Sequence, residues 1–60
     1  MRERFWSAQI DSTDNDRFYV RLYSLVDGDL TARTVLALDT VEECMIAIRD
    51  AVKNGIEVPE

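Results

Sequence analysis

The chain has 60 residues, with 12 acidic and 7 basic side chains, one cysteine and no histidine, and its net charge is −5. A domain of this length buries only about 60% of its unfolded surface, so we expect a partner or self-association to support it. One cysteine excludes an intramolecular disulfide, and the lack of histidine disfavours a zinc site. The acidic balance disfavours nucleic acid and anionic membranes as partners and favours a basic protein.

The chain contains no apolar run near the ~20 residues of a membrane span, and its first residues lead into a strand-like pattern rather than a signal segment. We therefore expect one domain over residues 1–60. The expected location is the cytoplasm, where the thiol would stay reduced.

Three segments alternate between apolar and polar residues, which is the pattern of strands with one buried face. They are residues 5–11, 17–25 and 31–38. Residues 12–16 and 27–29 separate them and are rich in Asp, Asn, Ser and Gly, the residues that form turns. Short connections predict antiparallel neighbours, and hence a three-stranded antiparallel meander.

A helix is predicted after the strands. Thr40 is a good N-cap, and Glu43 three residues later completes a capping box. Apolar residues then recur at the spacing of one helical face, up to Gly55, which is free to take a left-handed conformation, and Ile56, which can pack back on the helix. The fold class is therefore α+β, in the order β-β-β-α, and residues 56–58 are compatible with a short terminal strand.

The predicted core combines one face of the sheet with one face of the helix. It consists of Trp6, Ala8, Ile10, Phe18, Val20, Leu22, Leu36, Leu38, Val41, Cys44, Met45, Ile48 and Val52. The opposite face of the sheet then carries Phe5, Tyr19, Arg21, Tyr23, Arg33 and Val35. Tyr and Arg are enriched where proteins meet, and nothing else in the chain can cover this face, so it is the predicted protein-binding surface. The alternative is that these are ordinary exposed residues.

The polar side of the helix contributes further candidates. Ile46 lies there among charged residues, where a solitary exposed apolar side chain is common and a contact residue is the second interpretation. Glu42, Glu43 and Asp50 are the predicted acidic rim of the protein-binding surface. The two glutamates also complement the helix dipole, which is a structural role.

The sequence predicts no enzyme, no cofactor and no metal site. No histidine is present to act as a base, and two glycines are too few for a phosphate loop. Cys44 lies on the inward helix face and is predicted to be a small buried hydrophobe. A calcium loop beginning at Asp11 would need glycine at 16 and glutamate at 22, where Asp16 and Leu22 stand. A metal-dependent hydrolase of the RNase H kind is also disfavoured, because Asp11 lacks companion carboxylates on the next two strands.

The segments Asp39-Thr40-x-Glu42-Glu43 and Gly55-Ile56-x-Val58-Pro59 give the chain a resemblance to the amino-terminal domain of HicB-type antitoxins. The resemblance covers the layout of the whole chain and is specific over residues 39–60. It implies a degenerate RNase H-like sheet and an acidic, non-enzymatic protein that masks a small basic RNA-cleaving toxin of the HicA type. The family's Pro-x-Leu-Pro-Gly-Cys-like segment is replaced by residues 23–28. The family's DNA-binding domain is absent from these 60 residues, so a stand-alone domain is expected.

Other interpretations of the chain remain open. Small acidic phage proteins that inhibit host nucleic-acid-handling proteins share an opening strand like Phe5-Trp6-x-Ala8 and a similar layout. A structural homodimer whose sheet face serves only self-association is a second alternative, and a small domain of the YegP type is a third. For the antitoxin-like binding module we expect a homodimer and no direct contact with nucleic acid.

Overall fold

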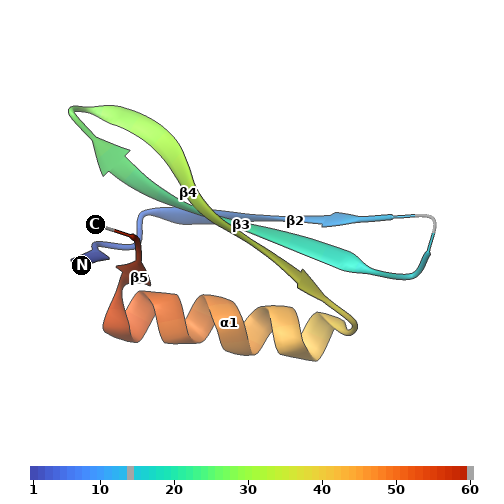
Figure 1. Ribbon diagram of the computed structural model, residues 1–60. Helices are drawn as coiled ribbons and strands as arrows, with labels where there is room; N and C mark the ends of the chain where they lie inside the picture. The colour runs from blue at the N-terminus through green and yellow to red at the C-terminus, as the bar shows by residue number, and fades with distance from the viewer. Residues whose placement is uncertain (14, 60) are drawn as a thin grey trace.

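A computed structural model describes residues 1–13 and 15–59; Asp14, which falls in the predicted turn 12–16, and Glu60 lie outside the described residues. The elements are β1 (Arg2–Glu3), β2 (Ser7–Ser12), β3 (Phe18–Val26), β4 (Asp29–Leu38), α1 (Val41–Asn54) and β5 (Ile56–Glu57). Strands β2, β3 and β4 form an antiparallel sheet in that order, and β1 pairs with β5 in a second, two-stranded sheet. The predicted α+β class and the β-β-β-α order are confirmed (Figure 1).

The turn between β3 and β4 is tighter than predicted. Val26 pairs with Asp29, so only Asp27 and Gly28 remain in the connection. Both have positive φ, 52° and 85°, as a two-residue hairpin turn of type I′ requires. Asp29 therefore belongs to β4. The hairpin of β3 and β4 extends past Ser7, the first residue of β2, as a two-stranded ribbon (Figure 1).

The helix begins and ends at the predicted residues. Thr40 Oγ1 accepts a hydrogen bond from the Glu43 amide at 3.1 Å, and its hydroxyl donates to Glu43 Oε1 at 3.3 Å. The Gly55 amide donates to the Ala51 carbonyl at 2.8 Å, with φ of +85°. A Cβ on Gly55 would lie 2.9 Å from the Glu3 carbonyl oxygen, so glycine is needed there for space as well as for conformation.

The core is smaller than predicted and is displaced along the chain. Its buried residues are Val20, Leu22, Cys44, Ala51, Ile56 and Val58. The prediction that Cys44 is buried is confirmed. Five predicted core residues are instead exposed: Trp6, Ile10, Val41, Met45 and Val52. The reason is that α1 packs mainly on β3 and β4, so β2 at the sheet edge and the helix flank beside it stay open.

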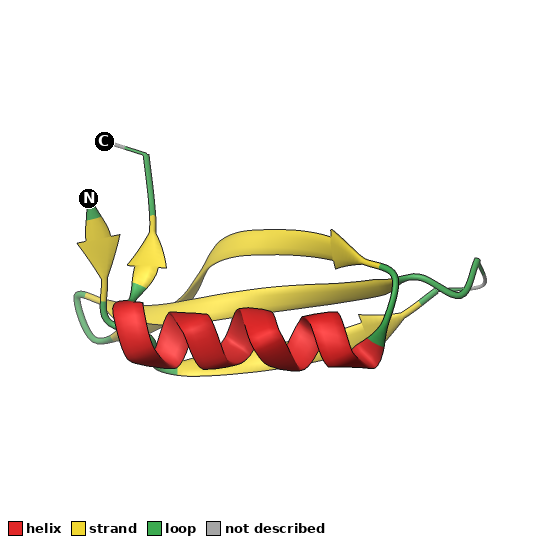
Figure 2. Ribbon diagram, turned by 90° about the horizontal axis from the view of Figure 1, so that it is seen from below, coloured by secondary structure: helices red, strands yellow, loops and turns green. Residues whose placement is uncertain are grey.

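The segment after the helix contributes two buried residues to the core. Ile56 and Val58 are buried, and the Val58 amide donates to the Met1 carbonyl at 2.9 Å. The short strand β1, which the alternation did not predict, pairs Glu3 with Ile56 and so joins the two ends of the chain. This long-range pairing closes the core at one end of α1 (Figure 2).

One irregularity in β4 changes the direction of a predicted surface residue. Leu22 pairs with Thr34 and Tyr23 pairs with Ala32, so Arg33 is an extra residue without a partner on β3. Such a bulge breaks the alternation of side chains. Arg33 instead contacts Glu3 of β1, with Nε 2.7 Å from Oε1.

Candidate functional site

The face of the sheet turned away from α1 is the candidate site, and we call it the outer face. Val20 and Leu22 are buried on the helix side, so the residues between and beyond them on β3 point outward. The outer face consists of Ser7, Gln9, Asp11, Tyr19, Arg21, Tyr23, Leu25, Leu30, Ala32, Val35 and Ala37. None of the described helices or strands covers it (Figure 1).

Hydrogen bonds order the half of the outer face that lies over β2 and β3. The Tyr23 hydroxyl donates to Gln9 Oε1 at 3.1 Å, and Gln9 Nε2 donates to Asp11 Oδ1 at 3.5 Å. The other carboxylate oxygen of Asp11 lies 3.2 Å from an Arg21 guanidinium nitrogen. These four side chains form a continuous row across two strands, which we call the polar row. Cross-strand pairs of this kind hold side chains in place before any partner binds.

The half over β3 and β4 is apolar. Val35 is 56% exposed and lies opposite Arg21 in the ladder, while Tyr19 lies opposite Ala37. Leu25 and Leu30 pair with each other on the protruding ribbon, and Leu30 is 53% exposed. An ordered polar half beside an exposed apolar half is the composition expected of a protein contact surface.

Leu25 and Leu30 were absent from the predicted site. The signal for them is the Asp-Gly dipeptide at 27–28, which is typical of a two-residue turn. Such a turn pairs residue 26 with 29 and residue 25 with 30, and it therefore sets the two leucines side by side on one face.

Two predicted members of the sheet surface lie elsewhere. Phe5 precedes β2, is partly buried and packs against the core. Arg33 is directed to Glu3 by the bulge, and both side chains are partly buried. Of the predicted sheet residues, Tyr19, Arg21 and Tyr23 are brought together on the outer face, with Val35 beside them.

The predicted helix residues lie on the opposite side of the molecule from the outer face. Ile46 is 64% exposed on the solvent side of α1. Glu42 and Glu43 are in the first helical turn, where Glu43 Oε1 accepts a hydrogen bond from the Thr40 hydroxyl. Asp50 accepts a hydrogen bond from Asn54 Nδ2 at 2.8 Å. These four residues cannot share one contact surface with Tyr19 and Tyr23, because the sheet lies between them (Figure 1).

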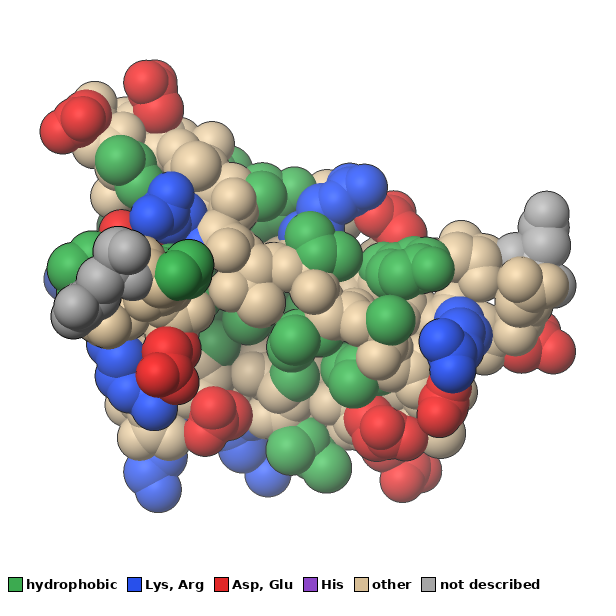
Figure 3. All heavy atoms as spheres, viewed as in Figure 1, with side chains coloured by type: hydrophobic (Ala, Val, Ile, Leu, Met, Phe, Trp, Pro, Cys, Tyr) green, Lys and Arg blue, Asp and Glu red, His purple; other side chains and the backbone are tan. Residues whose placement is uncertain are grey.

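Other acidic residues border the outer face. Asp27 and Asp29 lie at the tip of the β3–β4 ribbon, and Asp16 lies in the connection between β2 and β3. Figure 3 shows acidic side chains at the tip of the ribbon and hydrophobic side chains in the hollow between sheet and helix. Asp16 therefore lies at one end of the sheet, and Asp27 and Asp29 lie at the other.

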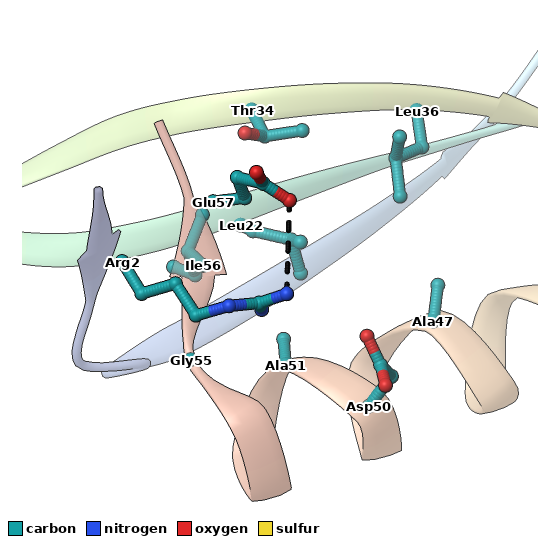
Figure 4. A pocket seen from close by; sticks show the side chains of 10 residues that line it. All are labelled: Arg2, Leu22, Thr34, Leu36, Ala47, Asp50, Ala51, Gly55, Ile56 and Glu57. Atoms are coloured by element: carbon teal, nitrogen blue, oxygen red, sulfur yellow. Dashed lines mark ion pairs between the residues drawn. The ribbon is translucent and has the colours of Figure 1, made fainter. Parts of the chain in front are cut away.

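The hollow below β4 has a volume of about 200 Å³. Leu22, Thr34 and Leu36 line it from the sheet, and Ala47 and Asp50 line it from α1 (Figure 4). An ion pair between Arg2 and Glu57 crosses it at 3.7 Å. A second hollow, of about 340 Å³, lies between Trp6 and Leu25.

Within residues 1–13 and 15–59, no three acidic, cysteine or histidine side chains lie close enough to hold a metal ion. The one helix of that part of the chain is too short and too polar to cross a membrane. Comparison of the chain with protein-family models, with curated proteins and with solved structures finds no match.

Proposed function

We propose that this chain is a protein-binding module whose outer face binds a basic protein, and that it acts as an antitoxin-like inhibitor. The observation that carries the proposal is the uncovered outer face, where an ordered polar row adjoins exposed Tyr19, Val35 and Leu30. Aromatic and arginine side chains of this kind contribute much of the binding free energy at protein interfaces.

The charge of the chain supports a basic partner. The net charge is −5, and Asp16, Asp27 and Asp29 border the outer face at its two ends. Acidic rim residues accelerate association with a basic protein, and salt weakens this effect. A small basic RNA-cleaving toxin of the HicA type, which the resemblance of residues 39–60 implies, has the required charge.

The test uses a purified HicA-type toxin and a labelled RNA substrate. The inhibitor hypothesis expects the chain to stop RNA cleavage at a stoichiometric ratio and to bind the toxin more slowly as salt is raised. Replacing Val35 with Lys places a positive charge in the centre of the outer face, opposite a basic partner, and is expected to weaken binding at least tenfold, a loss of about 1.4 kcal/mol. Ile46→Lys is the matched control, because it adds the same charge on the opposite side of the molecule.

Two results would contradict the proposal in different ways. If Ile46→Lys abolishes inhibition and Val35→Lys leaves it unchanged, the outer face is not the contact surface. If neither binding nor inhibition occurs with toxins of this type, the antitoxin part of the proposal fails.

A further inference from the structure

A row of apolar side chains runs along one flank of α1, and we call it the flank stripe. It consists of Val41, Met45, Ile48 and Val52. Val41, Met45 and Val52 are 49%, 56% and 61% exposed, while Ile48 is partly buried against the core. Three adjacent, half-exposed apolar side chains on a helix that also has a buried face indicate a second contact surface.

The flank stripe lies on the side of α1 that faces β2. On the other flank, Ala47 and Asp50 line the hollow beneath β4, so the stripe is turned toward the opposite edge of the sheet. Ile10 of β2 pairs with Val20 and is therefore on the same face of the sheet as the helix. Since α1 packs mainly on β3 and β4, Ile10 also stays exposed above the stripe.

We propose that the flank stripe is the seam of a homodimer in which the α1 helices of two copies pack antiparallel about a two-fold axis. The spacings along the stripe are four, three and four residues, which is the repeat of a coiled-coil seam. The stripe is symmetric about its own centre. In the antiparallel arrangement Val41 meets the partner's Val52, and Met45 meets the partner's Ile48, so a second copy fits the stripe completely.

The charges beside the stripe select the same arrangement. Glu42 and Arg49 flank it on the solvent side, and among residues 1–13 and 15–59 neither has an ion-pair partner. In the antiparallel dimer Glu42 lies beside the partner's Arg49, and the symmetry repeats the pair. A parallel dimer offers neither charge a partner, because the positions on the other side of the stripe are Cys44 and Ala51, which are buried against the chain's own sheet.

The helix is already formed before it meets a partner. Its N-cap at Thr40, its C-cap at Gly55 and its packing on β3 and β4 are all made within one chain. Association therefore orders only side chains and avoids the cost of folding a helix. The seam is two heptads long, so we expect a reversible dimer whose population depends on concentration. The outer face lies on the other side of the sheet and remains available, so the dimer is independent of the proposed inhibitor function.

Sedimentation of the full chain from about 1 µM to about 1 mM tests the dimer. The expected result is a monomer–dimer equilibrium that Met45→Lys weakens at least tenfold, since the new charge would be placed in the seam. Ile46→Lys is the matched control, because it adds the same charge to the neighbouring, even more exposed position on the solvent side, and it should leave the dimer unchanged. Circular dichroism of both variants checks that the fold is intact.

Two further experiments test the orientation. Glu42→Arg and Arg49→Glu should each weaken the dimer, and the double variant should restore it. An equimolar mixture of Val41→Cys and Val52→Cys chains should form a mixed disulfide, while neither chain should cross-link with itself. Self-linking of Val41→Cys alone would overturn the antiparallel arrangement.

A chain that stays monomeric over the whole range overturns the proposal. A dimer that Val35→Lys breaks and Met45→Lys does not break also overturns it, because self-association would then use the outer face. Loss of toxin inhibition in an intact dimer would count only against the proposed function.

Discussion

The outer face and the flank stripe are both exposed and partly apolar. The sequence predicted that the outer face is exposed, but it placed the flank stripe in the core. The outer face was expected to be open, and the structure leaves Tyr19, Arg21 and Tyr23 there. The flank stripe was expected to be core, and Met45 and Val52 are exposed. Alternation along a strand identifies the two faces of the sheet, whereas the helical pattern shows only that a side chain prefers an apolar neighbour and not which chain supplies it.

The largest expected effect is on the free energy of unfolding, and it distinguishes core residues from residues of the two surfaces. Ile56→Ala should lower the free energy of unfolding by about 2–5 kcal/mol, because it empties a fully buried site. Val52→Ala and Val35→Ala should each change it by no more than about 0.5 kcal/mol at concentrations where the chain is monomeric. Urea unfolding measures all three. A loss for Val52→Ala as large as that for Ile56→Ala would show that the stripe belongs to the core of one chain.

The next effect concerns the two glycines, one at the end of α1 and one at the end of the outer-face ribbon. Gly55→Ala should destabilise by about 2–3 kcal/mol, since φ is +85° and the added Cβ would meet the Glu3 carbonyl oxygen. Gly28→Ala is the matched control, because φ is also +85° and no atom lies within 4 Å of the added Cβ.

Thermal unfolding of the two alanine variants gives the difference. The Gly28 variant should lose about 1–2 kcal/mol, which is the conformational cost alone. Equal losses of free energy of unfolding in the two variants would mean that the close approach of Glu3 to the helix end adds nothing to the cost of Gly55→Ala.

Local patterns were sufficient for the elements, and long-range contacts decided the rest. The capping box at Thr40 and Glu43 and the glycine at 55 are local signals, and the structure has the helix between them. The pairing of Glu3 with Ile56 joins residues more than fifty positions apart and has no local pattern. No local pattern shows that α1 packs mainly on β3 and β4 either.

The candidate site shows the same division. Period two placed Tyr19, Arg21 and Tyr23 on one face because β3 is regular there. It failed at Arg33, since a single inserted residue in β4 reverses the side chain without changing the composition of the segment. The alternation also misplaced Phe5. The strand that was predicted to begin at Phe5 begins two residues later, at Ser7.

A smaller effect tests whether the N-cap keeps the first turn of α1, and with it the start of the flank stripe, in helical conformation. Thr40→Ala removes the hydroxyl that accepts from the Glu43 amide and should cost about 1 kcal/mol. Since the first turn carries Val41 and Glu42, its fraying should also weaken the proposed dimer. Thr40→Ser keeps the hydroxyl and is the control. Hydrogen exchange of the Glu43 amide reports the fraying directly, and unchanged protection in Thr40→Ala would contradict this role of the cap.

The smallest expected effect compares the ion pair of the outer face with the one that the bulge creates. A double-mutant cycle on Asp11 and Arg21 should give a coupling of about 0.2–1 kcal/mol at low salt that falls toward zero at high salt, because both side chains are well exposed. The cycle on Glu3 and Arg33 should give a larger, less salt-sensitive coupling, since that pair is shorter, at 2.7 Å, and more buried. Urea unfolding at two salt concentrations measures both. A coupling at Asp11 that equals the one at Glu3 would show that the polar row is a structural network of the sheet, and it would weaken the case that those side chains are kept in place for a partner.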